Sequence, residues 1–376
     1  MGLTMNDPRR GTTHQGSRVL RGPASARVVL DGREYINFAG WGYLALGGRP
    51  ELRDAARKAL EDGAAFASQL PTVYGVVDEA IRDLEVCAAQ YCATEEAVYA
   101  PSGYFIGAAA MMGVDLNDSV LFVDENAHFS LFEAAKLTTR TVVSFRHGDA
   151  ESLARSIHTA LPPKMKPIVV TDGVFATTGL VAPLDRYAAV IADYGGHLIV
   201  DEAHSFGVLG RHGRGAADYH GVESIATCGS TLSKAFCAQG AIIGCSVEVA
   251  ERLRRLPPLR GANPGSPLSA AVGAAAIRYV QLHPELRQRI TALTGYLRSR
   301  LRALGFDVGD SPAPIVAFRP GDRAFMQSIQ ERLMEQGIFV IISNYIGAGE
   351  GVIRCAIFAD HAEQDMDALT DTLSRL

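Results

Sequence analysis

Residues 97–230 carry six short apolar runs, which are AVYA (97–100), SVLFVD (119–124), TVVSF (141–145), PIVVTD (167–172), HLIVDEAH (197–204) and SIATCGS (224–230). Segments of helix length separate most of these runs. Continuous apolar runs are typical of strands buried on both faces, and parallel neighbours need a long crossover connection, usually a helix. The region therefore predicts an α/β fold with a mostly parallel sheet, covered by helices on both faces.

The flanking sequence has a different texture on each side. Upstream, PELRDAARKALEDG (50–63) has apolar residues at helical spacing and predicts a helix that Gly63 ends. Downstream, turn-rich LPPLRGANPGSP (256–267) precedes a helix with a leucine-rich stripe, followed by short strands and further helices. We expect three parts, an N-terminal arm (1–45), a large domain (46–258) and a smaller C-terminal α+β domain (259–376).

The composition of the 376-residue chain argues against several classes of protein. Lys plus Arg total 36 and Asp plus Glu total 41, so the net charge of −5 offers no basic excess for nucleic acid. The first twenty residues contain no apolar run of signal-peptide length, and no later run is long enough to span a membrane. The six cysteines form no CxxC pair. We expect a cytoplasmic protein with reduced thiols and no metal site.

Polar residues follow four of the apolar runs directly. Because the carboxyl ends of parallel strands meet at one rim of a sheet, where ligands bind, these residues should converge there. They are Ser102, Gly103 and Tyr104 after AVYA, Asp124 and His128 after VLFV, Asp201 and His204 after HLIV, and Thr231 and Lys234 after SIATCGS.

Three common motifs do not account for this group. DEAH at 201–204 also occurs in helicases, but a helicase needs an upstream GxxxxGK[ST] loop, and the chain has none. A GxGxxG fingerprint after a strand is missing, which leaves dinucleotide binding unsupported, and HExxH of zinc peptidases is absent.

Pyridoxal phosphate requires the residue types that the rim offers. Its aldehyde needs a buried lysine for a Schiff base, and its pyridine nitrogen needs a carboxylate that keeps it protonated. Its phosphate favours a helix start with free amides. The rim therefore favours this cofactor.

The motifs in order along the chain resemble those of the α-oxoamine synthases, which are pyridoxal-phosphate enzymes. The similarity runs from about residue 35 to the C-terminus, and the combination of DEAH, GVLGxxGRG and TLSKAF is highly specific. The matching segments are SGY (102–104), DENAHFS (124–130), DGVFATTGLVAPL (172–184), VDEAHSFGVLGRHGRG (200–215), STLSKAF (230–236) and VIRCAIFADH (352–361). The resemblance implies a fold type I pyridoxal-phosphate transferase, whose large domain binds the cofactor.

The resemblance also implies roles for the cofactor-side residues. Lys234 would form the Schiff base and move the Cα proton of the substrate, Asp201 would pair with the pyridinium nitrogen, and His204 with the ring hydroxyl. Two further residues, His128 and Ala203, would cover the ring faces. The SGY segment (Ser102, Gly103 and Tyr104) and the Thr231 hydroxyl would hold the phosphate.

The implied reaction is the condensation of an amino acid with an acyl thioester, carried by coenzyme A or an acyl-carrier protein, with decarboxylation to an α-aminoketone. Arg354 would clamp the carboxylate of the amino acid, a task that suits the guanidinium fork, although a structural ion pair is the alternative. The family forms homodimers with shared active sites.

The chain departs from the family pattern mainly on the substrate side. Ala176 replaces a serine near the cofactor, Trp41 stands where the family has an asparagine near the substrate, and Asp78 replaces a histidine. Asn263 would take the place of a phosphate-binding threonine that the neighbouring subunit supplies. A decarboxylase, aldolase or aminotransferase without a thioester, and a non-catalytic partner subunit, therefore stay open as alternatives.

Overall fold

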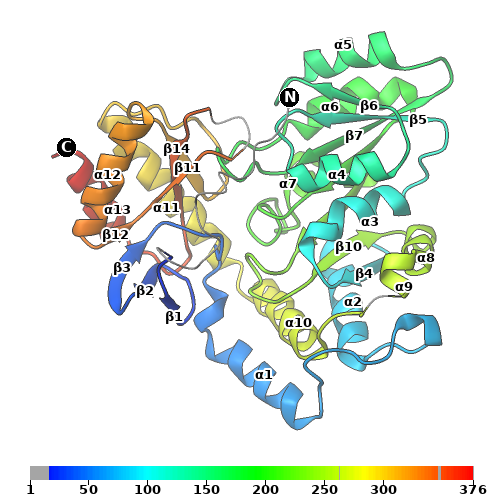
Figure 1. Ribbon diagram of the computed structural model, residues 1–376, viewed down its shortest axis with the longest axis horizontal. Coiled ribbons are helices and arrows are strands. Elements are labelled where there is room, and N and C mark those ends of the chain that lie inside the picture. Colours follow the sequence, from blue (N-terminus) through cyan, green and yellow to red (C-terminus); the bar gives the residue numbers. More distant parts are fainter. Residues whose placement is uncertain (1–16, 262, 346–348, 376) are drawn as a thin grey trace.

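The computed structural model describes residues 17–261, 263–345 and 349–375. A seven-stranded sheet forms the centre of the larger part of the molecule (Figure 1). In spatial order its strands are β4 (Glu96–Ala100), β10 (Ala241–Cys245), β9 (Ala226–Thr231), β8 (His197–Asp201), β7 (Lys166–Asp172), β5 (Ser119–Asp124) and β6 (Val142–Phe145). Only β10 runs against the others.

Alternate side chains of the central strands enter different cores. Leu121 and Val123 of β5 pack with α3 and α4, whereas Val120 and Phe122 belong to the core on the other face. This alternation explains why the strands read as continuous apolar runs. One face carries α3 (Ile106–Gly113), α4 (Phe129–Leu137) and α8 (Val247–Arg255), and the other carries α2 (Glu79–Cys92), α5 (Ala150–Ala160), α6 (Leu184–Ile191), α7 (Ala216–His220) and α10 (Pro267–Leu282).

The smaller part combines two sheets with three helices (Figure 1). An antiparallel sheet has the order β11 (Ile315–Phe318), β14 (Val352–Ala356) and β13 (Ile341–Ser343). A second sheet has the order β1 (Leu20–Arg21), β2 (Arg27–Leu30), β3 (Arg33–Asn37) and β12 (Ile338–Phe339). The helices are α11 (Glu285–Ala303), α12 (Arg323–Glu335) and α13 (Glu363–Leu373). Because β3 pairs with β12, the N-terminal strands lie against the C-terminal part.

Two more helices and five short 3-10 helices complete the described elements. They are α1 (Pro50–Glu61), α9 (Pro257–Arg260), η1 (Leu46–Gly48), η2 (Thr72–Tyr74), η3 (Gly103–Phe105), η4 (Ala192–Tyr194) and η5 (Glu223–Ile225). No helix within the described ranges combines the length and apolarity that crossing a membrane requires.

The structure confirms the predicted fold class and adds details that the sequence did not reveal. The helix expected at 50–63 is α1, and Gly63 follows it with a φ of 90°. The antiparallel strand β10 was not foreseen. The predicted domain start at residue 259 stays a prediction, and the packing of α10 against α1 and α2 favours a later division, inside α11. The interpretation of residues 1–16 lies outside the described residues.

Candidate active site

The polar rim forms where the central strands end. Asp172 is the last residue of β7 and lies opposite Asp201, the last residue of β8, in the parallel register. Asp124 ends β5 in the same way. Three carboxylates thus sit at the carboxyl edge of three adjacent strands, where the rule for open α/β sheets places a ligand.

Lys234 lies beside the histidine of the DEAH segment. Its Nζ is 2.8 Å from His204 Nε2, and His204 Nδ1 is 2.7 Å from the hydroxyl of Tyr43. Burial lowers the pKa of Lys234, and it lowers the pKa of His204 well below its usual value. The structure therefore brings together a lysine and a histidine whose pKa values are both lowered by burial.

Two of the three rim carboxylates, those of Asp201 and Asp172, interact electrostatically with Lys234. Asp201 is 6% exposed and its Oδ1 accepts a hydrogen bond of 2.9 Å from the amide of Ala203. Asp172 accepts one of 2.7 Å from the amide of His128. Burial raises the pKa of both acids, while Lys234 acts to lower them. A cationic ring nitrogen at this position would stabilise the charged carboxylate of Asp201.

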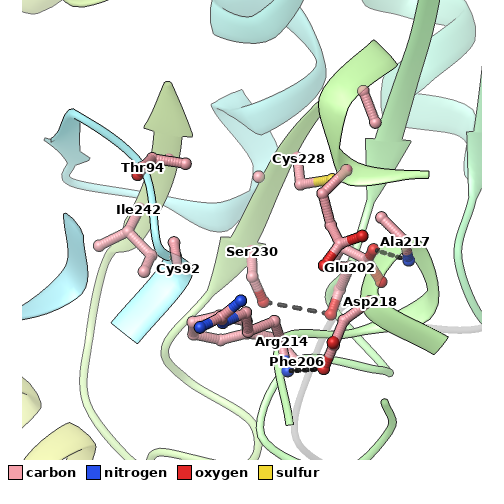
Figure 2. Close-up of a pocket in the computed structure, with 14 residues that line it drawn as sticks. Cys92, Thr94, Glu202, Phe206, Arg214, Ala217, Asp218, Cys228, Ser230 and Ile242 are labelled. Carbon is pink, nitrogen blue, oxygen red and sulfur yellow. Dashed lines mark hydrogen bonds between the residues drawn. The ribbon is translucent and has the colours of Figure 1, made fainter. Parts of the chain in front are cut away.

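The second acid of the DEAH segment, Glu202, lines a pocket together with Arg214 and Cys228 (Figure 2). Since successive residues of an extended segment face opposite sides, the Glu202 side chain faces the side opposite to that of Asp201. Its carboxylate accepts hydrogen bonds from the Ser205 hydroxyl and from the amides of Ala216 (2.7 Å) and Ala217 (2.9 Å), which begin α7. Glu202 therefore holds a helix start.

The position of the Glu202 carboxylate requires a glycine at residue 215, the second glycine of the GRG segment. Gly215 has a φ of 118°, and a Cβ there would lie 2.4 Å from Glu202 Oε2. A side chain at this position would be strained and would displace the buried carboxylate.

His128 occupies the N-cap of α4 and is surrounded by rings. Its Nδ1 is 2.6 Å from the Ser130 hydroxyl, and its ring centroid lies 4.4 Å from that of Phe129 and 5.6 Å from that of Tyr345. Burial lowers the pKa of His128, which favours a neutral ring. The location suits a stacking role, with Tyr345 as an additional aromatic neighbour.

The SGY segment forms a tight junction with the end of β9. The Ser102 side chain caps η3 by accepting from the Tyr104 amide at 3.3 Å. A Cβ on Gly103 would lie 2.5 Å from Thr231 Cβ, so only glycine allows this approach. The Thr231 hydroxyl lies 2.8 Å from that of Ser233. Helix-start amides beside clustered hydroxyls make a cradle that fits a phosphate group.

Arg354 reaches the site from β14 of the small part. Its Nε donates to the carbonyl of Ala176 at 2.6 Å, Nη1 to the carbonyl of Gly40 at 2.9 Å, and Nη2 to the Tyr43 hydroxyl at 3.3 Å. The side chain is buried, and none of the ion pairs in the described residues includes it. This weighs against the structural ion pair and leaves a buried guanidinium held in place without a carboxylate.

The remaining predicted positions lie further from this network. Trp41 is 53% exposed, next to Gly40. Asn263 donates to the carbonyl of Ser68 at 2.6 Å and accepts from the amide of Gly265 at 2.8 Å. Asp78 is the N-cap residue of α2 without a side-chain cap bond.

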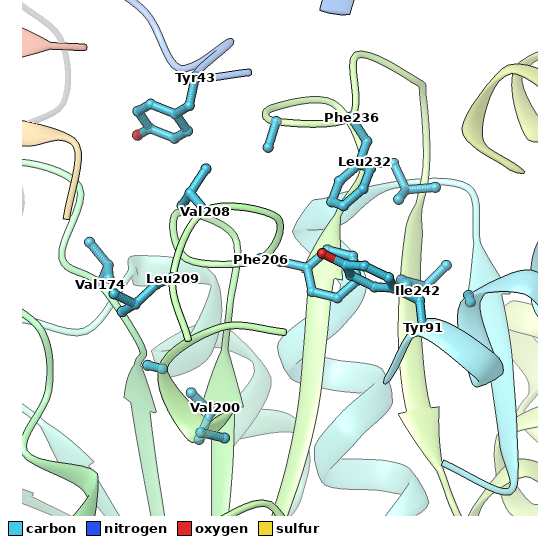
Figure 3. Close-up of a cluster of buried hydrophobic side chains, with 14 of the residues drawn as sticks. Tyr43, Tyr91, Val174, Val200, Phe206, Val208, Leu209, Leu232, Phe236 and Ile242 are labelled. Atoms are coloured by element: carbon cyan, nitrogen blue, oxygen red, sulfur yellow. The ribbon is translucent and has the colours of Figure 1, made fainter. Parts of the chain in front are cut away.

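Several site residues were not singled out from the sequence. Tyr43 belongs to the main buried cluster, where it extends from the N-terminal segment above Val208 (Figure 3). Asp172 stood at the end of an apolar run, which was the available signal. His147 Nδ1 is 2.9 Å from Asp124 and lines a cavity of about 70 Å³ with His128, Asp172, Ala176 and Tyr345, among others.

The family of class I and II aminotransferases matches residues 33–373. The chain belongs to this family. Within it, the resemblance to the α-oxoamine synthases is confirmed by the curated relatives. The 8-amino-7-oxononanoate synthase of Geotalea daltonii is 30% identical over 365 residues, which cover 96% of this chain and 93% of the relative. That of Coprothermobacter proteolyticus is 28% identical over 368 residues, with 96% and 93% covered.

Solved structures show the same fold. The serine palmitoyltransferase of Sphingomonas wittichii superposes with a TM-score of 0.88 at 24% identity, over 96% of this chain and 92% of that chain. The 8-amino-7-oxononanoate synthase of Francisella tularensis gives a TM-score of 0.76 at 21% identity, over 91% and 97%. At these identities the likeness establishes the fold, and the residues of the site must carry the function.

Proposed function

We propose that this chain is a pyridoxal-phosphate-dependent C-acyltransferase that condenses an amino acid with an acyl thioester and releases the free thiol, carbon dioxide and an α-aminoketone. The observation that carries the proposal is the pairing of Lys234 with His204 at the rim, beside buried Asp201. Curated relatives that match 96% of this chain bear the name 8-amino-7-oxononanoate synthase.

The residues present fit the cofactor. Gly103 and Thr231 make a junction that only glycine permits, and its helix-start amides would hold the phosphate. Asp201 would pair with the ring nitrogen, and His128 and Ala203 would cover the ring faces. When bound, the cofactor supplies an electron sink for the negative charge that develops at the substrate Cα.

Lys234 would take the Cα proton on its Nζ. An amine accepts a proton only when it is uncharged, and burial at this position favours that form. Asp201, kept charged by a cationic partner, would hold the proton on the ring nitrogen. Arg354, fixed by three neutral oxygens, would orient the amino acid through its carboxylate.

The alternative reactions lack support of this kind. A decarboxylase, aldolase or aminotransferase acting without a thioester is not favoured by the names of the relatives. A non-catalytic subunit would have no physical need for buried Lys234, Asp201 and His204, whose burial carries an electrostatic cost.

A second copy of the chain is the proposed partner. Apolar side chains are exposed around η2 and α2, namely those of Phe66, Leu70, Val73, Tyr74, Val76, Val77 and Val86. An exposed apolar group of this extent is typical of an interface. A homodimer with shared active sites would cover it and would let Asn263 of each subunit approach the other's phosphate site. We also propose a cytoplasmic location, with coenzyme A or an acyl-carrier protein as the thioester carrier.

The test is a two-substrate assay. The purified protein with pyridoxal phosphate is mixed with single amino acids and a panel of acyl thioesters, and free thiol, carbon dioxide and aminoketone are measured. We expect thiol release that depends strictly on one amino acid. Turnover of the amino acid in the absence of any thioester would contradict the proposal.

A further inference from the structure

The hydroxyl of Tyr43 joins two parts of the site that the proposed reaction uses separately. It lies 3.3 Å from Arg354 Nη2 and 2.7 Å from His204 Nδ1, and the ring is fully buried. These are the two hydrogen-bond partners of the hydroxyl in the described part of the chain. A continuous chain of hydrogen bonds therefore runs from Arg354 through Tyr43 and His204 to Lys234 Nζ.

The number of protons on each group determines which group donates in each of these hydrogen bonds. A guanidinium can only donate, so the Tyr43 oxygen accepts from Arg354. Burial raises the pKa of Tyr43 to about 12, so the phenol keeps its one proton. If His204 Nδ1 carried a proton, it would also donate to Tyr43, and the phenol proton would have no acceptor among the described residues. A buried donor without a partner is unfavourable.

The favoured arrangement has the phenol donating to His204 Nδ1. A neutral imidazole has one proton, which then lies on Nε2, the atom beside Lys234. An Nε2–H group can donate to the lysine only when the amine is uncharged. The tautomer that Tyr43 selects thus opposes protonation of Lys234.

The charged groups around Lys234 make this selection important. Asp201 and Asp172 act to raise its pKa, while burial, the larger effect, and Arg354 act to lower it. Lys234 is therefore subject to opposing influences, and His204 Nε2 lies 2.8 Å from its Nζ.

Around His204 the surrounding charges act in one direction. Burial, Lys234, Arg354 and His128 all lower its pKa, so the ring stays neutral and its tautomer is what can vary. Tyr43 is the neighbour that decides this tautomer.

We propose that Tyr43 is a positioning residue that fixes the proton of His204 on Nε2 and thereby keeps Lys234 uncharged and ready to attach the cofactor. The proposal rests on the proposed function for the role of Lys234, and it adds a residue to which the sequence analysis gave no role. It also connects the carboxylate clamp at Arg354 to the reactive amine.

The test compares Tyr43→Phe with wild type in the cofactor-free protein. The rate at which pyridoxal phosphate attaches is followed by absorbance across a range of pH. Removing the hydroxyl should slow attachment about tenfold near neutral pH and move the pH profile up by about one unit, since one pKa unit is tenfold in the uncharged amine. Tyr91→Phe is the matched control, because Tyr91 is also buried but donates to the carbonyl of Gly213 at 3.0 Å.

A second measurement does not depend on any variant of Tyr43. Nitrogen-15 NMR of labelled histidine in the wild-type cofactor-free protein, with His204→Gln to assign the signal, should find the His204 proton on Nε2. A proton on Nδ1, or an attachment profile of Tyr43→Phe that matches wild type, would overturn the proposal. If wild type itself attaches no cofactor, or Lys234→Ala attaches it equally, the proposed function fails instead.

Discussion

Asp201 and Trp41 represent the cofactor side and the substrate side of one site, and the protein holds them differently. Asp201 is 6% exposed and fixed by a backbone amide, whereas Trp41 is 53% exposed. Asp201 matches the family motif, whereas Trp41 departs from it at a position that we propose lies on the substrate side. At these two positions the buried residue is the one that matches the family pattern, and the exposed residue is the one that differs.

Arg354 is informative because we propose that it binds the substrate and it is nevertheless buried. Three neutral oxygens hold it, one of them the carbonyl of Ala176. The contact uses the backbone of residue 176, so the replacement of a serine side chain there leaves the clamp in place. The amino-acid carboxylate is therefore expected to be a fixed requirement, and the other substrate groups the variable ones.

The largest effect is expected for Lys234→Ala. The cofactor should no longer be retained covalently after borohydride reduction, because the variant lacks the amine that forms the link. Mass spectrometry of the reduced protein measures the label. Lys166→Ala, at an exposed lysine that begins β7, is the control and should keep the full label. Undiminished labelling of Lys234→Ala would show that another lysine is used.

Asp201→Asn should come next. The amide cannot stabilise a cationic ring nitrogen, and each pKa unit of lost stabilisation is worth about 1.4 kcal/mol. A change of several units should slow exchange of the substrate Cα proton by orders of magnitude, with the fold retained. Proton exchange in deuterated water, followed by NMR, measures the rate. Exchange near the wild-type rate would remove Asp201 from its role.

Arg354→Ala should weaken binding of the amino acid by about one to two decades, since a charge-assisted hydrogen-bonded pair contributes roughly 1.5–3 kcal/mol. Cofactor binding should change far less. Spectral titration with the amino acid measures the affinity. Arg354→Lys should recover little, because an ammonium cannot reproduce the fork that three oxygens now orient. An unchanged titration for Arg354→Ala would return this residue to a structural role.

The sequence predicted the fold because the strand signal is local. Runs such as HLIVD are buried on both faces, so their apolar character reports directly on their place in the sheet. The strand β10 was not predicted. Its short run, AIIGC, follows a turn, and the strand lies antiparallel between β4 and β9. Pairing direction depends on contacts far along the chain, which a local pattern does not contain.

For the site, residues directly after strands were predictable and residues that arrive from elsewhere were not. Lys234 and Asp201 stand at or near strand ends, where topology alone brings them together. Tyr43 arrives from a loop before α1, and a buried tyrosine in an apolar segment looks like any core residue. The resemblance to a family was needed for Arg354, because nothing in its local pattern indicates that β14 faces the large sheet.

The smallest and most specific effect is expected for Trp41→Asn, which restores the residue of the family pattern. Trp41 is half exposed and next to Gly40, whose carbonyl holds Arg354, so its ring stands near the proposed amino-acid site without being part of the core. If it shapes the approach of the acyl thioester, the variant should change the preference among acyl chain lengths by severalfold and leave amino-acid binding nearly untouched. Rates of thiol release across a series of acyl thioesters provide the measurement. Phe325→Asn, at an exposed aromatic residue of α12, serves as the control.

An unchanged chain-length profile would mean that Trp41 does not contact the acyl group, and an equal loss for every thioester would mean that the ring supports the site as a whole. The distinction between these outcomes rests on selectivity, because only a residue that touches the acyl chain can discriminate between chains that differ by a few methylene groups, each worth about 0.8 kcal/mol when buried.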